Sequence, residues 1–427
     1  MNKISDITEL RDFIIYLEEK YDLLNFEIDG VKPWLLKRVA IDYDLGAICS
    51  VMDTPHTTLS KKDKILNILN FIKSSIFNNP FFSKKVDTII FPHSRVKEVD
   101  GEIIDIYTYY FINKLIEDKK SFIEIERPSN GKHFKKKEDW RYYNDFIQVF
   151  KEIFSQFVKL QDIDYDKIRK VESEIEERIG KYDLLNLFIS TTKKYKIEYF
   201  LYKKLLKKLE PKQVYVVVSY GGFGSLIKAA KDLGIETIEF QHGNFSKYHF
   251  GYYFGEDKKE LDYFPDKFLV WNEYWKSLIN FPIDDKNIII KGFDFLENKK
   301  KSYLDIKRVE NRIVVLSQGV LGDKIAKKIL DNWDFFKKFD INYKLHPGEY
   351  DRWQEYESLI ILAKKSNVEI IKNTDLYMLF SSCQYQVGVF STALSEGVEL
   401  GCETILLDLS GIEEMYEFRK IYNVKVI

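Results

Sequence analysis

Short apolar strands alternate with helices from residue 213 onward, and this alternation constrains the fold more than any other feature of the sequence. QVYVVVSYGGFGS (213–225) has the pattern of a β-branched strand that runs into glycines, and SLIKAAKDLG (225–234) that of a helix ending in glycine. The strand patterns IETIEFQHG, KFLVWN and NIIIKG follow. Strands that are apolar along their whole length are typical of a parallel sheet covered by helices on both faces.

The alternation restarts after residues 293–310, which we interpret as a linker. Strands are predicted at 312–319, 341–347, 368–372, 385–390 and 403–408, and helices around 322–338, 351–365, 374–381 and 392–400. The sequence therefore predicts an α/β fold with two Rossmann-like, doubly wound domains that face each other across a cleft. We place these domains at 1–300 and 301–427. The final stretch IYNVKVI predicts a last strand without a closing helix, so we expect the chain to be trimmed there.

The first domain carries additional elements before residue 213. Helical periodicity predicts added helices within 1–80 and 137–208. VDTIIFP (86–92) and SFIEIERP (121–128) are predicted strands, and Asp100-Gly101 between two alternating runs predicts a β-hairpin.

Composition excludes some classes of partner and site. Lys plus Arg number 66 and Asp plus Glu number 67, so the overall charge gives no sign of a nucleic-acid-binding protein. The lysine runs 135–137, 203–208 and 299–301 are flanked by acids, which favours solvated helix faces. Contact with an anionic membrane face is the alternative for these runs.

Cysteine usage and hydropathy indicate an intracellular protein. Cys49, Cys383 and Cys402 lie far apart without a CxxC pair, which argues against a disulfide framework or a zinc site. The sequence shows no signal peptide and no apolar run long enough to cross a membrane. We expect a cytoplasmic protein, with peripheral contact at the inner face of the cell membrane left open.

Candidate phosphate-binding residues follow three strands of the second domain. His346, before Pro347, lies where a strand ends, and an imidazole there can donate to a phosphate oxygen. Ser391 and Thr392 begin a helix, whose N-terminal N–H groups attract anions. Glu396, about one turn later, is placed to hold a ribose, and Gly319 ends another strand at the same edge. The structural alternatives are a histidine satisfied by a loop carbonyl and an ordinary capped helix.

Candidate residues of the first domain also follow strands. His242 ends the strand IETIEFQ and could accept a proton from an acceptor hydroxyl; the alternative is a buried histidine bonded to a backbone carbonyl. Gly222, within Gly221–Gly224, could cradle acceptor or phosphate oxygens, although the run is no strict GxGxxG. His93 and Arg95 could hold an anionic acceptor.

An aromatic loop follows His242. It contains His249 with Tyr248, Tyr252 and Tyr253, and exposed tyrosines there could stack on sugars. The two DxD spacings, 42–44 and 162–164, lie in helical or capping contexts, so we expect no metal site.

Residues 213–408 resemble the GT-B glycosyltransferases that build bacterial capsules and lipopolysaccharides. YKLHPGE and GVFSTALSEGVELGCETILLD are similar to the donor-binding half of bacterial sialyltransferases, polysialyltransferases and CDP-glycerol glycerophosphotransferases. The resemblance implies that His346, Ser391 and Thr392 bind the donor phosphate and that Glu396 binds the ribose.

The first domain resembles these families more loosely. Sialyltransferases carry an acidic pair before a glycine, whereas Val99-Asp100-Gly101 has one acid, and Asp100 suits the hairpin turn. IEFQHGN is similar to the strand-end histidine of the wall polymerases, which implies that His242 is the base.

The predicted function is therefore transfer of a sugar from a nucleotide donor to a bacterial surface glycan or lipid-linked glycan. CMP-nonulosonate or CMP-Kdo is the favoured donor and a UDP-sugar the next. Inversion is expected, with no metal or other cofactor. The alternatives are a CDP-polyol phosphotransferase, a UDP-sugar 2-epimerase-like enzyme and a non-catalytic scaffold, because a fold alone does not select a reaction.

Overall fold

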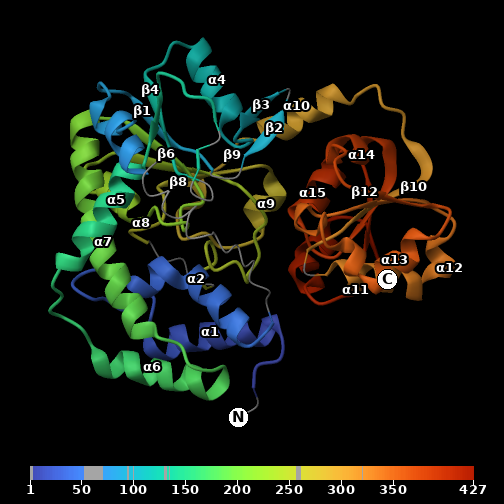
Figure 1. The fold of residues 1–427 in the computed structure, drawn as a ribbon, viewed down its shortest axis with the longest axis horizontal. Coiled ribbons are helices and arrows are strands. Elements are labelled where there is room, and N and C mark those ends of the chain that lie inside the picture. The colour runs from blue at the N-terminus through green and yellow to red at the C-terminus, as the bar shows by residue number, and fades with distance from the viewer. Residues whose placement is uncertain are drawn as a thin grey trace. The chain divides into compact units, whose positions relative to one another are not determined.

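The computed structural model describes residues 3–51, 71–93, 96–99, 101–128, 132–133, 135–255, 261–319 and 321–427. The chain divides into two compact units, Met1–Gly292 and Phe293–Ile427 (Figure 1). The expected boundary at residue 300 falls inside helix α10 (Asp294–Ser302), which belongs to the second unit. The predicted linker is thus partly helical. Two acids in the first turn of α10 and three lysines in its last turn suit the helix dipole.

One parallel sheet organises the described residues of the first unit. Its strands are β1 (Thr88–Phe91), β4 (Phe122–Glu126), β5 (Arg141–Tyr143), β6 (Gln213–Val217), β7 (Glu236–Phe240), β8 (Lys267–Val270) and β9 (Ile288–Ile290). They lie in the order β5-β4-β1-β6-β7-β8-β9. The chain therefore winds outward in one direction from β1 and in the other from β6, and the carboxyl ends of β1 and β6 flank the point of reversal.

The predicted hairpin and one unpredicted strand complete the strands of this unit. Strands β2 (Lys97–Val99) and β3 (Glu102–Ile104) pair antiparallel, as expected on either side of the turn. The stretch 137–208 was expected to be helical, but it begins with β5, which pairs with β4 in parallel. The short polar edge strand has no apolar pattern of its own, and long-range pairing with β4 forms it.

The described helices of this unit are α1 (Ile7–Tyr21), α2 (Pro33–Ile48), α4 (Tyr109–Glu117), α5 (Asp145–Phe154), α6 (Tyr165–Arg178), α7 (Leu184–Leu209), α8 (Gly224–Lys231) and α9 (Glu273–Ser277). Some of them cover the two faces of the sheet, whereas α1 packs on α2 and α6. Leucines of α7 and apolar residues of α8 bury one face, while α4 packs on the other (Figure 1). Burial of both faces explains the unbroken apolar strands.

The second unit repeats the design. Its strands are β10 (Val309–Leu316), β11 (Asp340–Lys344), β12 (Val368–Ile371), β13 (Cys383–Gly388), β14 (Glu403–Leu406) and β15 (Val424–Val426). All pair in parallel, in the order β12-β11-β10-β13-β14-β15, which is the doubly wound 3-2-1-4-5-6 arrangement. The point of reversal lies between β10 and β13.

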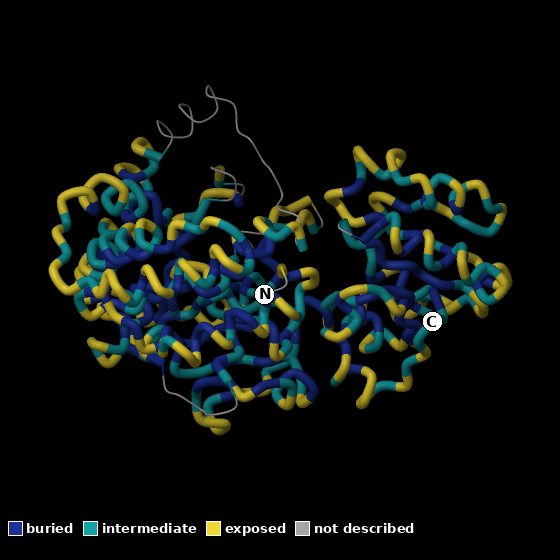
Figure 2. The backbone as a smooth tube through the Cα atoms, turned by 90° about the horizontal axis from the view of Figure 1, so that it is seen from below, coloured by how far each residue is buried: buried dark blue, intermediate teal, exposed yellow. Residues whose placement is uncertain are grey.

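Helices also flank this second sheet. Besides α10 they are α11 (Gly322–Asp331), α12 (Trp333–Phe336), α13 (Glu357–Ala363), α14 (Leu376–Ser382), α15 (Thr392–Glu399) and α16 (Tyr416–Ile421). Figure 2 shows buried residues in the interior of each unit and exposed residues at its periphery. Two Rossmann-like, doubly wound units confirm the predicted α/β class of the GT-B type. In the described part of the chain, no helix is both long enough and apolar enough to cross a membrane.

A buried ionic cluster joins β4 and β5 to the segment between them. Lys135, expected on a solvated face, is only 7% exposed and forms an ion pair with Glu124, which also accepts from Arg141 Nε at 2.8 Å. His133 lies 3.1 Å from Glu126 Oε1 and 3.0 Å from Asp145 Oδ2 through its two ring nitrogens. Burial lowers the pKa of His133, but the hydrogen bonds to the two carboxylates outweigh burial and raise this pKa to about 9.

We predict that His133→Asn destabilises the protein most at neutral and acidic pH. The raised pKa means that the folded state holds a proton that the unfolded state loses above pH 6.5. This contribution, about 3 kcal/mol for a shift of this size, is complete below pH 6.5 and is lost as the pH rises to about 9. Urea unfolding of both proteins from pH 6 to 10 measures it.

The difference in unfolding free energy between wild type and His133→Asn should shrink across that window. His249→Asn is the control, because the pKa of His249 is lowered to about 4 and its contribution changes below pH 6.5. A difference that stays constant from pH 6.5 to 9 would contradict a protonated His133.

Candidate functional site

The carboxyl ends of three neighbouring strands bring together the candidate residues of the first unit. His93 follows β1, Tyr220 follows β6 and His242 follows β7, and these strands are adjacent in the sheet. The rings of His93 and His242 are stacked, with centroids 5.9 Å apart and an interplanar angle of 18°. Two residues predicted from separate strand ends thus form one cluster.

His242 is held between two tyrosine hydroxyls. Its Nδ1 lies 3.1 Å from the Tyr252 hydroxyl, and its Nε2 lies 3.2 Å from the Tyr220 hydroxyl. Tyr252 in turn donates to Glu239 Oε1 at 2.6 Å, and the backbone N–H of Ser219 donates to the same oxygen at 3.0 Å. Both of these partners of the His242 ring are side chains, whereas the structural alternative expected a backbone carbonyl.

The hydrogen bonds assign the tautomer of His242. Tyr252 has one proton and gives it to Glu239, so its oxygen accepts from Nδ1–H of His242. Nε2 of His242 is then unprotonated and accepts from Tyr220. The hydrogen bonds of His249 are consistent with this assignment. The N–H of Gly251 donates to His249 Nδ1 at 3.3 Å, so His249 carries its proton on Nε2, which lies 3.5 Å from the Tyr220 hydroxyl.

Burial keeps the ring of His242 neutral near neutral pH. Burial lowers the pKa of His242 well below its usual value, and the nearby His249 and His93 lower it further. Burial also raises the pKa of Glu239, which is fully buried, to about 7. A neutral imidazole with an unprotonated Nε2 is the state that a general base requires.

The aromatic loop contributes a hydrogen-bonding side chain to this cluster, which the sequence did not indicate. Tyr252, considered for sugar stacking, is fully buried and hydrogen-bonded, and Tyr248 is 7% exposed, so neither offers its ring to a ligand. His93 donates its backbone N–H to Asp105 at 3.0 Å, and burial raises the pKa of that carboxyl. The candidates Arg95 and Asp100 lie outside the described residues.

Arg127 fixes the glycine turn at the end of β6. Its guanidinium donates to the carbonyls of Gly221 and Gly222, both at 2.8 Å, and lies 3.5 Å from the ring centre of Phe223. Gly222 has φ +97°, a conformation in which other residues are strained. The predicted glycine loop is therefore a rigid turn held by a cation.

In the second unit, His346 lies at the end of β11 within a capped turn. Its Nδ1 accepts from the N–H of Gly348 at 3.1 Å, and its own N–H donates to Glu349 Oε2 at 2.8 Å. Because Nδ1 accepts, the neutral ring carries its proton on Nε2 and is a hydrogen-bond donor there. The buried Glu349 also accepts from Ser317 at 2.9 Å, which ties the ends of β10 and β11 together.

Gly319 lies beside His346, and the sequence had predicted that both residues lie at the same edge of the sheet. A Cβ at position 319 would lie 3.5 Å from His346 Nδ1 and 3.6 Å from Arg352 Nη2, and Arg352 donates to the Gly319 carbonyl at 2.7 Å. Gln318 Nε2 donates to the Phe390 carbonyl, so the loops after β10 and β13 are joined across the point of reversal. Open α/β sheets bind ligands at this point.

Ser391 is the N-cap of α15, with its hydroxyl accepting from Ala393 N–H at 3.2 Å. Thr392 is the first residue of this helix and Glu396 lies one turn further along. The cap satisfies one backbone N–H of the helix. An ordinary capped helix was also the structural alternative to a phosphate site at this position. Roles of these three side chains in ligand binding stay predictions.

The sequence did not predict roles for Tyr220, Glu239 and Arg352. Tyr220 lies only three residues beyond β6, so testing every polar residue near a strand end would have included it. Glu239 is an acid in the interior of a largely apolar strand, which signals a buried carboxylate with a partner. Groups of His, Cys, Asp or Glu suited to a metal ion are absent from the described ranges.

The N-terminal helices hold the aromatic loop through one buried ion pair. Arg38 of α2 bonds both oxygens of Glu18 of α1 at 2.6 Å, and both residues are at least 94% buried. Its remaining nitrogen donates to the carbonyls of Phe250 and Tyr253, on either side of Tyr252. The added helices thus position the loop that orients His242.

No protein-family model matches the chain, and no curated protein is significantly similar to it. Solved structures align over most of its length. They include UDP-GlcNAc 2-epimerase from Methanocaldococcus jannaschii (13% identity, 80% of this chain, 88% of that chain, TM-score 0.45). A glycosyltransferase from Rickettsia africae (12%, 81%, 84%, 0.40) and MurG from Acinetobacter baumannii (12%, 80%, 85%, 0.41) also align. Likeness at this level does not identify a reaction, so the function must be argued from this chain's residues.

We predict that Arg38→Met lowers the free energy of unfolding by about 3–5 kcal/mol, because it leaves Glu18 charged and buried without its partner. Denaturant unfolding of the single variants and of the double variant Glu18→Leu/Arg38→Met measures this. The double variant should lose less than the sum of the single losses. Additive losses, or a single loss below about 1 kcal/mol, would show that the pair does not hold the loop.

Proposed function

We propose that this chain is a glycosyltransferase that uses a nucleotide-activated sugar donor, with His242 as the general base. The observation that carries the proposal is the neutral His242, whose hydrogen bonds place a proton on Nδ1 and leave Nε2 as an acceptor. An acceptor hydroxyl that takes the place of the Tyr220 hydroxyl would meet this nitrogen. The second unit supplies the nucleotide-binding half at the β10–β13 point of reversal.

The proposed step is a direct displacement. The acceptor oxygen forms a bond to the anomeric carbon, its proton passes to His242 Nε2, and the bond from that carbon to the donor phosphate breaks. The Nδ1–H bond to Tyr252 and the buried Glu239 beyond it stabilise the imidazolium that forms. Attack opposite the leaving group inverts the configuration, and no metal or other cofactor takes part in this scheme.

The second unit would stabilise the departing phosphate with neutral donors. His346 offers Nε2–H from its capped turn, and Gly319 lets a ligand approach beside it. Ser391 and Thr392 would contribute at the start of α15, and Glu396 would hold the ribose. These roles rest on the sequence resemblance together with the shared sheet edge.

For the donor we favour a CMP-linked nonulosonate or CMP-Kdo, followed by a UDP-sugar, and for the acceptor a bacterial surface glycan. The three other functions would leave different signatures. A CDP-polyol phosphotransferase would bind CDP and form phosphodiesters. An enzyme like the UDP-GlcNAc 2-epimerases would convert the sugar nucleotide without any acceptor. A non-catalytic scaffold would bind nucleotides poorly.

We predict that one of CMP, CDP, UDP and GDP raises the melting temperature of the wild type and that His346→Ala abolishes the shift. A ligand present at a hundredfold excess over its Kd stabilises the folded state by about 2.7 kcal/mol. Thermal melting with each nucleotide measures the effect. Lys324→Ala, an exposed position on α11, is the control and should keep the full shift.

His242→Ala separates binding from chemistry in the same assay. It should keep the nucleotide shift and lose turnover by about 10²–10⁴-fold, as expected for removal of a general base. Absence of a shift with all four nucleotides would overturn the proposal in favour of a scaffold. A His242→Ala variant with wild-type turnover would overturn the assignment of the base.

A further inference from the structure

A polar pocket of about 510 Å³ lies in the first unit beside the Gly221–Gly222 turn. Its walls come from α2, α5, α7 and the start of α8, and its volume lies in the range of small-molecule sites. Four cationic side chains line it: Lys37, Arg127, Lys151 and Lys194. Glu198 is the single carboxylate among the lining residues of the described chain, so the pocket carries excess positive charge.

Three of these four cations have hydrogen-bond or ion-pair partners, and Lys37 is the exception among the described residues. Lys151 forms an ion pair with Glu198 at 2.9 Å, and Lys194 forms one with Glu152 outside the pocket at 2.8 Å. Arg127 bonds the carbonyls of the glycine turn. Lys37, partly buried, has no side-chain hydrogen bond or ion pair within the described ranges, and burial followed by repulsion from Lys151 lowers its pKa.

A second unsatisfied group lines the same pocket. Thr191 is 7% exposed, and its hydroxyl has no hydrogen-bond partner among the described residues. Buried hydroxyls in folded proteins nearly always have a partner. The Thr191 oxygen is itself buried in the wall, so its side chain must rotate to turn the hydroxyl toward a ligand. The unpaired Lys37 ammonium in the same cavity calls for a ligand that carries negative charge.

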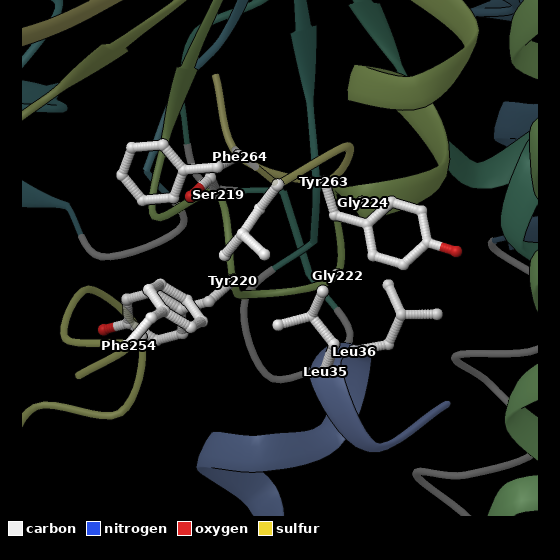
Figure 3. A pocket seen from close by; sticks show the side chains of 11 residues that line it. Leu35, Leu36, Ser219, Tyr220, Gly222, Gly224, Phe254, Tyr263 and Phe264 are labelled. Carbon is white, nitrogen blue, oxygen red and sulfur yellow. The ribbon is translucent and has the colours of Figure 1, made fainter. Parts of the chain in front are cut away.

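The pocket adjoins the His242 cluster through a shared wall. Leu36, Gly222 and Gly224 also line a small apolar cavity of about 40 Å³, together with Ser219 and Tyr220. Figure 3 shows Leu35 and Leu36 at the start of α2 lying toward the glycine turn, with Tyr220 labelled in the same cavity. Tyr220 is the residue whose hydroxyl faces Nε2 of His242.

We propose that the pocket between α2, α5 and α7 binds an anionic, hydroxyl-rich ligand, with Lys37 pairing its charged group and Thr191 bonding its oxygens. The ligand class is a sugar that carries a phosphate or a carboxylate. Identifying this ligand as the charged part of the glycan acceptor rests on the proposed function, whereas binding itself does not. Ligand charge would compensate Lys37 without moving the existing ion pairs.

Calorimetric titration of the full chain with glucose 6-phosphate, glucuronate and uncharged glucose tests the proposal. We expect binding of at least one of the two anions and none of glucose, and the anion that binds identifies phosphate or carboxylate. Lys37→Met should weaken that binding at least tenfold, and Thr191→Val should weaken it by a smaller factor. Lys207→Met, on the exposed side of α7, should bind as the wild type does.

Melting temperatures show whether Lys37 has a structural role instead. Lys37 has no partner to lose, so Lys37→Met should melt no lower than the wild type, since removing an unpaired buried charge relieves a cost. Equal affinity of wild type and Lys37→Met, or no binding of either anion, would overturn the proposal. Anion binding without any rise in melting temperature with a nucleotide would support the pocket and overturn the proposed glycosyltransferase. A rise in melting temperature with a nucleotide but no anion binding would overturn the pocket and support the glycosyltransferase.

Discussion

The buried ion pair of Glu18 and Arg38 is the interaction on which the site of the first unit depends. One guanidinium satisfies a carboxylate of α1 and reaches the carbonyls of Phe250 and Tyr253 in the loop after β7. A buried charge without such partners costs several kcal/mol, on the order of the net stability of a whole domain. The loop therefore has one favourable position relative to the N-terminal helices, and that position puts Tyr252 against His242.

From this anchor, hydrogen bonds run in one direction through His249, Tyr220, His242 and Tyr252 to Glu239. Backbone N–H groups set both ends, so the side-chain protons have one consistent arrangement. The pKa of Glu239 near 7 lets its carboxyl change charge within the buried end of the chain. A neutral base coupled to such a carboxyl can accept a proton without leaving an isolated buried charge, which is the physical basis of the proposed chemistry.

Much of the fold was predictable, because apolar strands alternating with helices leave few arrangements. The expectation that site residues follow strand ends placed Gly319 at the same edge as His346, where the structure has it. It also selected His93 and His242 separately, and the structure brings their rings together. It did not identify Glu239 or Arg38, because their importance comes from partners distant in sequence and not from a local pattern. Strand β5 was missed for the same reason: its polar residues become a strand only through pairing with β4. Stacking on sugars was considered for Tyr252 because sequence alone does not separate exposed from buried tyrosines.

The proposed role of His242 depends on the protonation of its ring, which ¹⁵N NMR of the histidine side chains reports. The His242 signal is identified by its loss in His242→Gln, among the six histidines of the chain. At pH 7 we expect a neutral ring with the proton on Nδ1 and an unprotonated Nε2, as the bond through Tyr252 to Glu239 requires. A proton on Nε2, or a charged imidazolium at that pH, would contradict the role of His242 as the base.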